Sequence, residues 1–319
     1  MIAAGLGPAS AGLSAAATLV FPVVGPILMP LSAARLARLV RNGSEAGGFA
    51  LAALTVPFAM VFGLLAGAAG PVLAPVVAVA LAALPALGLS VAARDGRRLD
   101  LVSIVVASLV AVGGLAVLAG VGLATGLAPG EVVARRLDVA LPELVASYRK
   151  AGLVESSLSA MESLFVALTW MVRHQLTGLV LLGAVLYGTL LTYPAGRAAG
   201  VPGWKVTATS FAQYRTPLAA VVLFVAAGLG AGLGAGRARH GAIDILLPLG
   251  ALFFVRGMAI IRALLDRGGV GLLGRALAWS LVVQMPLPIL VALGGLFDEF
   301  FGFRERLFTR HGPEGGKAP

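Results

Sequence analysis

The sequence has 319 residues, of which 59% are hydrophobic and 12% charged, with a mean hydropathy of +0.98. Soluble domains are about 45–50% apolar and about 25% charged, so this composition excludes a soluble globular protein. The formal net charge is +10, but the arginines stand at the ends of apolar runs, which indicates membrane anchoring and argues against nucleic-acid binding. The absence of cysteine excludes disulfides and thiolate metal sites.

Apolar segments long enough to span a bilayer begin at the N-terminus. The stretch Ile2 to Val20 is interpreted as a first span and not as a removed signal. A proline cluster follows, so residues 22–41 form either a short second span or a re-entrant turn. The 48 residues between Glu45 and Arg94 carry no charged side chain and no histidine. Because a helical span needs about 20 apolar residues, this run predicts two spans, separated at Gly70.

A further span is predicted from Leu101 to Gly126, and after it the character of the chain changes. Between Glu131 and His174 charges recur every few residues. The pattern predicts an amphipathic helical linker, residues 129–174, at the membrane interface. This linker joins an N-terminal transmembrane half (1–128) to a C-terminal transmembrane half (175–303), and residues 304–319 are expected to form a charged flexible tail. The apolar stripe of the linker consists of Leu158, Met161, Phe165, Leu168 and Val172.

The C-terminal half predicts four more spans, within residues 175–193, 218–236, 243–263 and 276–297. The predicted fold is therefore an all-α polytopic transmembrane helix bundle of eight or nine helices. Lysine and arginine are balanced between the two sets of loops, so the orientation in the membrane stays open.

Arg256 is the most informative single residue, because it lies near the middle of the predicted span Ile243 to Ala263. At about 1.5 Å per residue, it is about 10 Å from the nearer end of that span. An ionised group at such depth usually faces a cavity or a partner. We expect Arg256 to bind the anionic group of a ligand or to form an ion pair. The alternative is that its side chain snorkels toward the end of the helix near Arg262.

A broken helix is expected in the last span. Gln284 lies near the middle of this span and is followed by Met285-Pro286-Leu287-Pro288. In a helix, Pro288 would free the carbonyl of Gln284, and Pro286 that of Val282. Transporters build ligand sites at broken helices of this depth, so Gln284, Pro286 and Pro288 are predicted ligand-binding residues. A simple kink is the alternative.

Acidic, aromatic and basic residues follow the last span within two turns, from Asp298 to Arg306. The first interpretation of this pattern is an interfacial anchor. The second is a structural or docking clamp, in which Phe303 takes part and Asp298 pairs with Arg304 or with an arginine from another loop.

Residues suited to catalysis or metal binding are scarce. Lysine occurs only at positions 150, 205 and 317, and none of the three ends a glycine-rich phosphate-binding loop, so the sequence shows no ATPase motif. Histidine occurs only at positions 174, 240 and 311, which provides no metal-ligand cluster. We therefore expect no enzyme activity, no cofactor and no metal, and any energy from ATP must come from a partner.

The second half of the chain resembles a known family. The stretch Phe253-Phe254-Val255-Arg256-Gly257-Met258-Ala259, the stretch Gly294 to Arg304 and the lead-in Phe211 to Pro217 resemble the signature of the YybS-like family of uncharacterised bacterial membrane proteins. This family is distantly grouped with the S components of energy-coupling-factor transporters. The resemblance implies a multi-pass protein of the bacterial cytoplasmic (inner) membrane that holds a small molecule and depends on a separate ATPase. We count Gly257 with Arg256 in the expected ligand site.

Two functions are carried forward from the sequence. The first is a transport-related membrane subunit that binds a small molecule or ion around Arg256 and the broken helix at Gln284 to Pro288. The second is a non-transporting membrane scaffold for cell-envelope or division machinery, which would dock through the linker and the tail. The expected partners are the lipid bilayer, a small-molecule ligand, and a separate ATPase or an envelope protein.

Overall fold

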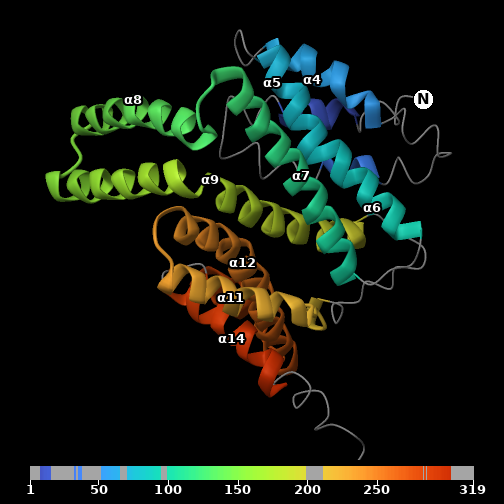
Figure 1. The fold of residues 1–319 in the computed structure, drawn as a ribbon. Helices are drawn as coiled ribbons and strands as arrows, with labels where there is room; N and C mark the ends of the chain where they lie inside the picture. Colours follow the sequence, from blue (N-terminus) through green and yellow to red (C-terminus); the bar gives the residue numbers. More distant parts are fainter. Residues whose placement is uncertain are drawn as a thin grey trace, which may run out of the picture.

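The computed structural model describes residues 8–15, 32–33, 35–37, 52–64, 70–94, 99–198, 211–282, 284 and 286–302. Over these residues the regular secondary structure is helical and no strand occurs, as the sequence predicts. The segment 22–41 lies largely outside the described residues, and so does the tail from residue 303 onward. Figure 1 shows two groups of helices and a long hairpin that extends to one side of them.

The N-terminal group contains α4 (Thr55–Gly63), α5 (Gly70–Ala78), α6 (Leu84–Arg94) and α7 (Leu99–Thr125). α5 begins at Gly70, where the sequence predicts a break between two spans. Small side chains let helix backbones approach closely where no water separates them. Alanines accordingly make up most of the core of this group, packed around Leu36, Leu89, Val102 and Val106.

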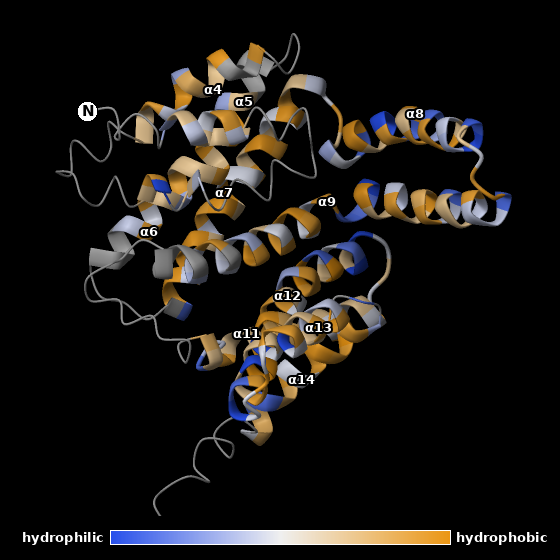
Figure 2. Cartoon of the chain, turned by 180° about the vertical axis from the view of Figure 1, so that it is seen from behind, coloured by the Kyte–Doolittle hydropathy of each residue, from blue (hydrophilic) through white to orange (hydrophobic). Residues whose placement is uncertain are grey.

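The hairpin is formed by α8 (Pro129–Lys150) and the first part of α9 (Glu155–Ala198), and we call residues 129–174 the arm. Gly126 and Gly152 adopt φ values of +66° and +85°, which favour glycine and let the chain turn before α8 and between the two helices. In the predicted apolar stripe, Leu158 and Val172 are buried. Figure 2 shows that hydrophilic and hydrophobic residues alternate along the arm, whereas the other helices are mainly hydrophobic.

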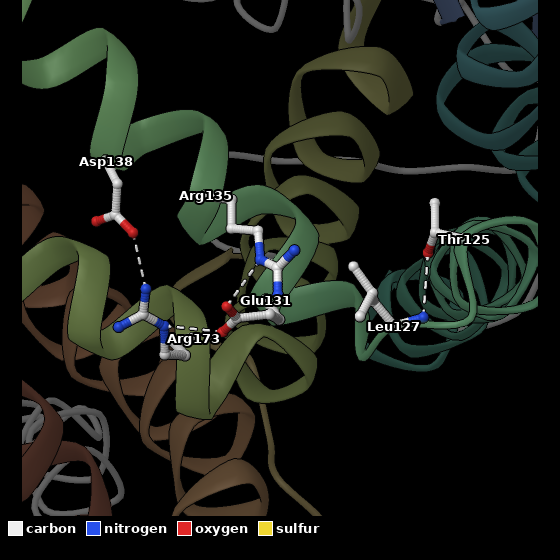
Figure 3. A network of polar contacts seen from close by, with 6 residues as sticks. All are labelled: Thr125, Leu127, Glu131, Arg135, Asp138 and Arg173. Atoms are coloured by element: carbon white, nitrogen blue, oxygen red, sulfur yellow. Dashed lines mark hydrogen bonds and ion pairs between the residues drawn. The ribbon is translucent and has the colours of Figure 1, made fainter.

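Ion pairs join the two helices of the arm at its base, where it meets the remaining helices. Arg173 of α9 pairs with Glu131 at 3.0 Å and with Asp138 at 2.8 Å, both on α8 (Figure 3). Glu131 also pairs with Arg135 at 3.1 Å. These side chains are partly exposed, so each pair stabilises the arm only slightly, but together they specify how α8 lies against α9. A second set at the tip joins Arg149 to Glu155 and Glu162.

A hydroxyl group of α9 completes an irregular turn in the N-terminal group. The residues between α5 and α6, Val79–Ala83, form a π-helical turn. Pro85 has no N–H, so it cannot donate to the carbonyl of Leu81 four residues earlier. The Tyr187 hydroxyl donates to that carbonyl. The two halves of the chain are therefore joined by a polar contact as well as by packing of α7 on α9.

The C-terminal group contains α11 (Leu218–Leu233), α12 (Gly236–Arg267), α13 (Leu272–Val282) and α14 (Leu287–Phe301). α12 is its central helix and packs against α9, α11 and α14. Val255 and Ala259 of α12 are buried against Tyr214, and Phe253 of α12 is buried against Ala220 and Val221 of α11. The sequence predicts one interrupted span between residues 276 and 297, and the structure has two helices there, α13 and α14, bent by 99° at the break.

Among the described residues, three helices are long and apolar enough to cross a membrane: Asp100–Thr125, Glu155–Tyr193 and Gly236–Arg267. The bent pair α13 and α14 makes a fourth if both count as one span. Two shorter apolar helices, Ala74–Ser90 and Leu218–Leu233, lie beside them. The structure is thus that of a helical membrane protein with three or four spans in its described part, whereas the sequence predicts eight or nine crossings over the whole chain.

Candidate functional site

Arg256 lies in α12, and its side chain is 7% exposed and faces α14. Its Nε and Nη2 donate to the same carboxylate oxygen of Asp298, at 3.1 and 3.0 Å. Its Nη1 donates to the hydroxyl of Thr216 at 2.7 Å and pairs with the carboxylate of Glu299. We call Arg256, Thr216, Asp298 and Glu299 the Arg256 cluster. It joins α12 to α14 and to the segment that precedes α11.

Two glycines let α12 and α14 approach closely enough for this cluster to form. A Cβ at Gly257 would overlap the carbonyl oxygen of Val291, and a Cβ at Gly295 would overlap the carbonyl oxygen of Phe253. The backbones of the two helices therefore touch, as at membrane helix crossings that small residues permit. Asp298 lies one turn beyond Gly295 and so reaches the Arg256 guanidinium.

A cavity of about 330 Å³ lies between α7, α9, α11 and α12. Both halves of the chain contribute to it, and its walls are mostly apolar. Hydroxyl groups are its main polar groups, and it includes Pro248, the proline within α12. The hydroxyl residues that line it are Ser103 and Ser108 of α7, Thr189 of α9, and Tyr214 before α11.

Tyr214 connects the cavity with the Arg256 cluster. It lines the cavity and is 1% exposed. Its hydroxyl group interacts with the side chain of Ser103 and lies within the electrostatic range of Asp100 and Arg256. Ser103 and Asp100 belong to α7, and Arg256 belongs to α12. Tyr214 thus lies near buried polar groups of both the N-terminal and the C-terminal group.

The residues of the Arg256 cluster and of the cavity all lie within the part of the chain that a known family model matches. A family model described as a predicted membrane protein, DUF2232, matches residues 11–299, which is most of the chain. The chain belongs to this family. The membrane character predicted from composition is thereby confirmed. Comparisons with curated proteins and with solved structures give no match for the chain.

The DUF2232 range ends at Glu299, so it contains the complete Arg256 cluster. In this cluster the guanidinium donates hydrogen bonds to the carboxylate of Asp298 and the hydroxyl of Thr216, and it forms an ion pair with the carboxylate of Glu299. The sequence allows an ion pair as well as an anionic ligand at Arg256, and the ion pair is what the structure contains. An anionic ligand would have to displace Asp298 or Glu299, and ligand binding by Arg256 stays a prediction.

One residue of the predicted clamp, Asp298, is paired in the structure, and its predicted pairing with Arg304 stays a prediction. The sequence suggested Arg304 or an arginine from another loop as the partner of Asp298, and the structure pairs Asp298 with Arg256 of a neighbouring helix. Phe303 and Arg304 lie outside the described residues. The signal that sequence reasoning missed is the presence of complementary charges on two predicted spans, Arg256 within one and Asp298 at the end of the other.

The broken helix exists, but its polar groups are arranged differently from the prediction. Gln284 and Pro286 are exposed, and Pro288 is half-buried. The carbonyl of Gln284 accepts a hydrogen bond from the Leu287 N–H at 2.8 Å, so the tight turn satisfies the group that Pro288 was expected to free. Gly257 and Asp298 are brought together with Arg256, whereas the structure records no polar contact that joins Gln284 to them among the described residues.

A second polar cluster joins α9 to α12 at the base of the arm. Gln175 departs from helical geometry with φ −129° and ψ 21°, so the following turn of α9 begins like a new helix. Asp244 of α12 accepts a hydrogen bond from the Gly178 N–H at 2.9 Å, as a capping residue would. The Gln175 amide donates to Asp244 at 2.8 Å and to the carbonyl of His240 at 3.1 Å. The rings of His174 and His240 lie 5.2 Å apart beside it.

Neither cluster is suited to hold a metal. In the part of the chain that the structure describes, no group of three or more histidine, aspartate and glutamate side chains could bind one. The structure therefore offers a cavity for binding. The Arg256 cluster and the second polar cluster connect α12 to the helices around it.

Proposed function

We propose that this chain is a transport-related membrane subunit that binds a small molecule in the cavity between α7, α9, α11 and α12. The single observation that supports the proposal is this cavity, whose volume of about 330 Å³ falls within the usual range of small-molecule sites, about 300–1,000 Å³. Its walls come from both halves of the chain. Transporters commonly place their ligand between two halves of a bundle, because relative movement of the halves then changes access to it.

The proposed activity is binding without catalysis. The chain lacks a lysine at the end of a glycine-rich phosphate loop, so a separate ATPase would supply any energy from ATP. This division of labour agrees with the resemblance of residues 211–217, 253–259 and 294–304 to the YybS-like family and, more distantly, to S components of energy-coupling-factor transporters. A multi-pass location in the bacterial cytoplasmic membrane is part of the proposal.

The test is recovery of the molecule that the cavity holds. The full chain is purified into lipid nanodiscs, and bound small molecules are extracted and identified by mass spectrometry. Ala219 lines the cavity on α11 and is exposed, so Ala219→Trp should fill the opening without disturbing the core. Ala226 is also exposed on α11 but does not line the cavity, and Ala226→Trp is the matched control.

We expect to recover the same molecule from the wild type and from Ala226→Trp. The amount recovered from Ala219→Trp should be lower by about tenfold or more, because the tryptophan side chain displaces the molecule from the cavity. Equal recovery from all three proteins, or recovery of bulk lipid alone, contradicts the proposal. Uptake of the identified molecule by vesicles that contain the chain with an added ATPase would then test the transport role.

A second function, a non-transporting scaffold for envelope or division machinery, is favoured by the surface of the arm. Large apolar side chains are exposed there, including Val139 at 65%, Leu164 at 64% and Val166 at 71%. Exposed apolar surface of this kind often marks an interaction site. The scaffold predicts a stoichiometric envelope protein that co-purifies with the wild type and is lost from a Leu164→Gln, Val166→Gln double variant. A paired Ser156→Gln, Ser157→Gln variant, which changes exposed polar positions of the same helix, should retain it.

A further inference from the structure

We infer that the cavity takes an uncharged, lipid-soluble molecule that donates hydrogen bonds, and that this molecule enters sideways from the bilayer between α7 and α11. The inference rests on the proposed function and adds the chemical class of the ligand and its route. Three properties of the cavity carry it: the charges of its walls, the direction of the hydrogen bonds made by its hydroxyl groups, and the side chains around its opening.

The walls of the cavity offer no partner for an ion. No aspartate, glutamate, lysine, arginine or histidine lines it. The nearby cation is Arg256, whose guanidinium donates to Asp298 and Thr216 and pairs with Glu299. A charged ligand would therefore lose its hydration without gaining a counter-ion, which is strongly unfavourable in an apolar site. The ligand is uncharged on these grounds.

Two of the four hydroxyl groups in the walls, those of Ser103 and Thr189, already use their protons and can accept hydrogen bonds. The Ser103 hydroxyl donates to the carbonyl of Asp100 at 2.8 Å, and the Thr189 hydroxyl donates to the carbonyl of Val185 at 2.9 Å. A hydroxyl has one proton and two lone pairs, so each of these oxygens retains acceptor capacity after its proton is used. A molecule with a hydroxyl or amide N–H group complements the Ser103 and Thr189 oxygens, whereas a molecule that only accepts does not complement these two.

The opening of the cavity is bordered by side chains suited to lipid. α9 and α12 form the back of the cavity, because α7 packs on α9, α9 on α12, and α12 on α11. On the rim, Leu223 of α11 is 54% exposed and Ser108 of α7 is also exposed. Apolar neighbours on the same two helices are exposed as well: Val105 39%, Val112 64%, Leu218 66% and Val222 63%.

Both of these helices are apolar along their length, and α7 is one of the helices that can cross a membrane. Their exposed faces therefore meet acyl chains, and the opening between them leads into the hydrocarbon region. A molecule that partitions into the bilayer reaches the cavity by this route without passing through water. An acyl chain of the bilayer could fill the same space, but it carries no hydrogen-bond donor, and this difference separates the two cases.

Four probes with one terpene body test the inference: geraniol, geranyl methyl ether, geranic acid and geranylamine. At pH 7 the alcohol and the ether are neutral, the acid is an anion and the amine is a cation. Only the alcohol is both neutral and a donor. Binding of each labelled probe to nanodiscs that contain the full chain is measured in excess of binding to empty nanodiscs, which removes partition into lipid.

The expected result is saturable binding of geraniol, about tenfold tighter than that of the other three probes, the ratio produced when a buried polar group is left unpaired. Ala219→Trp at the rim should abolish the excess binding and Ala226→Trp should leave it unchanged. Thr189→Val removes one acceptor at constant shape, and it should weaken binding of geraniol several-fold without affecting the ether.

Other outcomes overturn the inference in distinguishable ways. Tighter saturable binding of the acid or the amine, sensitive to Ala219→Trp, overturns the uncharged class but leaves the proposed function intact. Equal binding of the alcohol and the ether overturns the donor requirement and indicates an acyl-chain slot. Saturable binding of geraniol that Ala219→Trp does not change overturns the route. Absence of saturable binding by all four probes overturns the inference, and the proposed function is then judged from the molecule recovered with the purified chain.

Discussion

Arg256 of α12 donates two hydrogen bonds to a single carboxylate oxygen of Asp298 on α14, although the two residues are 42 positions apart in the sequence. Their side chains are 7% and 1% exposed. Charges removed from water in this way are strongly unfavourable unless each has a partner of opposite charge. The crossing of α12 and α14 therefore depends on both residues: loss of Arg256 removes the cation that Asp298 and Glu299 share, and loss of Asp298 removes two of the hydrogen bonds of Arg256.

Replacement of Arg256 should destabilise the protein strongly. Arg256→Ala removes the cation from the buried carboxylate of Asp298 and from the partly buried carboxylate of Glu299, and we expect a loss of about 3–5 kcal/mol in the free energy of unfolding. Arg256→Lys retains the charge but cannot make the same set of directed hydrogen bonds, and its effect should be smaller. Thermal unfolding of the detergent-solubilised full chain measures both.

Arg262 provides the matched control for this prediction, since it lies on the same helix and pairs with Asp266 at 2.9 Å in a more exposed setting. Arg262→Ala should reduce stability by less than about 1 kcal/mol. Similar melting temperatures for Arg256→Ala and Arg262→Ala would contradict the interpretation of the Arg256 cluster as a buried contact between α12 and α14. A double variant, Arg256→Met with Asp298→Leu, should be more stable than Arg256→Ala, because it buries no unpaired charge at Asp298.

The Arg256 cluster shows what the sequence reveals and what it leaves open. The depth of Arg256 in an apolar run is sufficient to predict a buried cation with a partner or a cavity, because lipid offers few other solutions. The choice of Asp298 as partner requires knowledge of which helices touch. That contact depends on Gly257 and Gly295, whose role becomes visible only when the two helices are placed side by side.

The cavity and the broken helix illustrate the same limit. Ser103, Ala107 and Ala111 recur every four residues along α7 and mark a face of small residues, which is a weak signal for close packing or for a cavity. The walls opposite this face come from residues 70 or more positions later, so no local pattern predicts them. At Gln284, the prolines predict the break correctly, but the turn that satisfies the Gln284 carbonyl depends on local geometry that the sequence does not specify.

The crossing of α12 and α14 should tolerate no added side chain at its two contact glycines. Gly257→Ala and Gly295→Ala each place a Cβ onto a backbone carbonyl, and we expect each to lower stability by about 1–3 kcal/mol, as overpacking does. Gly250 of α12 and Gly294 of α14 have no atom within 4 Å of an added Cβ. Gly250→Ala and Gly294→Ala should therefore be neutral or slightly stabilising in the same unfolding measurement, since alanine favours the helix. Equal losses in all four variants would contradict the proposed close contact.

The bond between Asp244 and Gly178 should stabilise the second part of α9 in the manner of a helix cap. Asp244→Ala removes the acceptor of the Gly178 N–H and of the Gln175 amide, and we expect a loss of about 1–2 kcal/mol. Asp244→Asn retains one oxygen acceptor and should lose about half as much or less. Hydrogen exchange of the amides in residues 176–180 should accelerate in Asp244→Ala and stay near the wild-type rate in Asp244→Asn. If both variants exchange equally fast, the negative charge matters and the hydrogen bond does not explain the contact.

The base of the arm should weaken in acid through Glu131. The hydrogen bond from Arg135, with smaller contributions from Arg173, holds the pKa of Glu131 below its ordinary value of 4.5. Because the pKa is depressed in the folded protein, the stabilisation is fully present above pH 4.5 and is lost as the pH falls through the lower folded value. The melting temperature of wild type should therefore exceed that of Glu131→Gln at pH 7, and the difference should shrink as the pH falls below 4.5. Glu143→Gln, at an exposed position of the same helix, is the control. If the difference in melting temperature between wild type and Glu131→Gln stays constant from pH 7 to pH 3, the carboxylate charge does not stabilise the base of the arm.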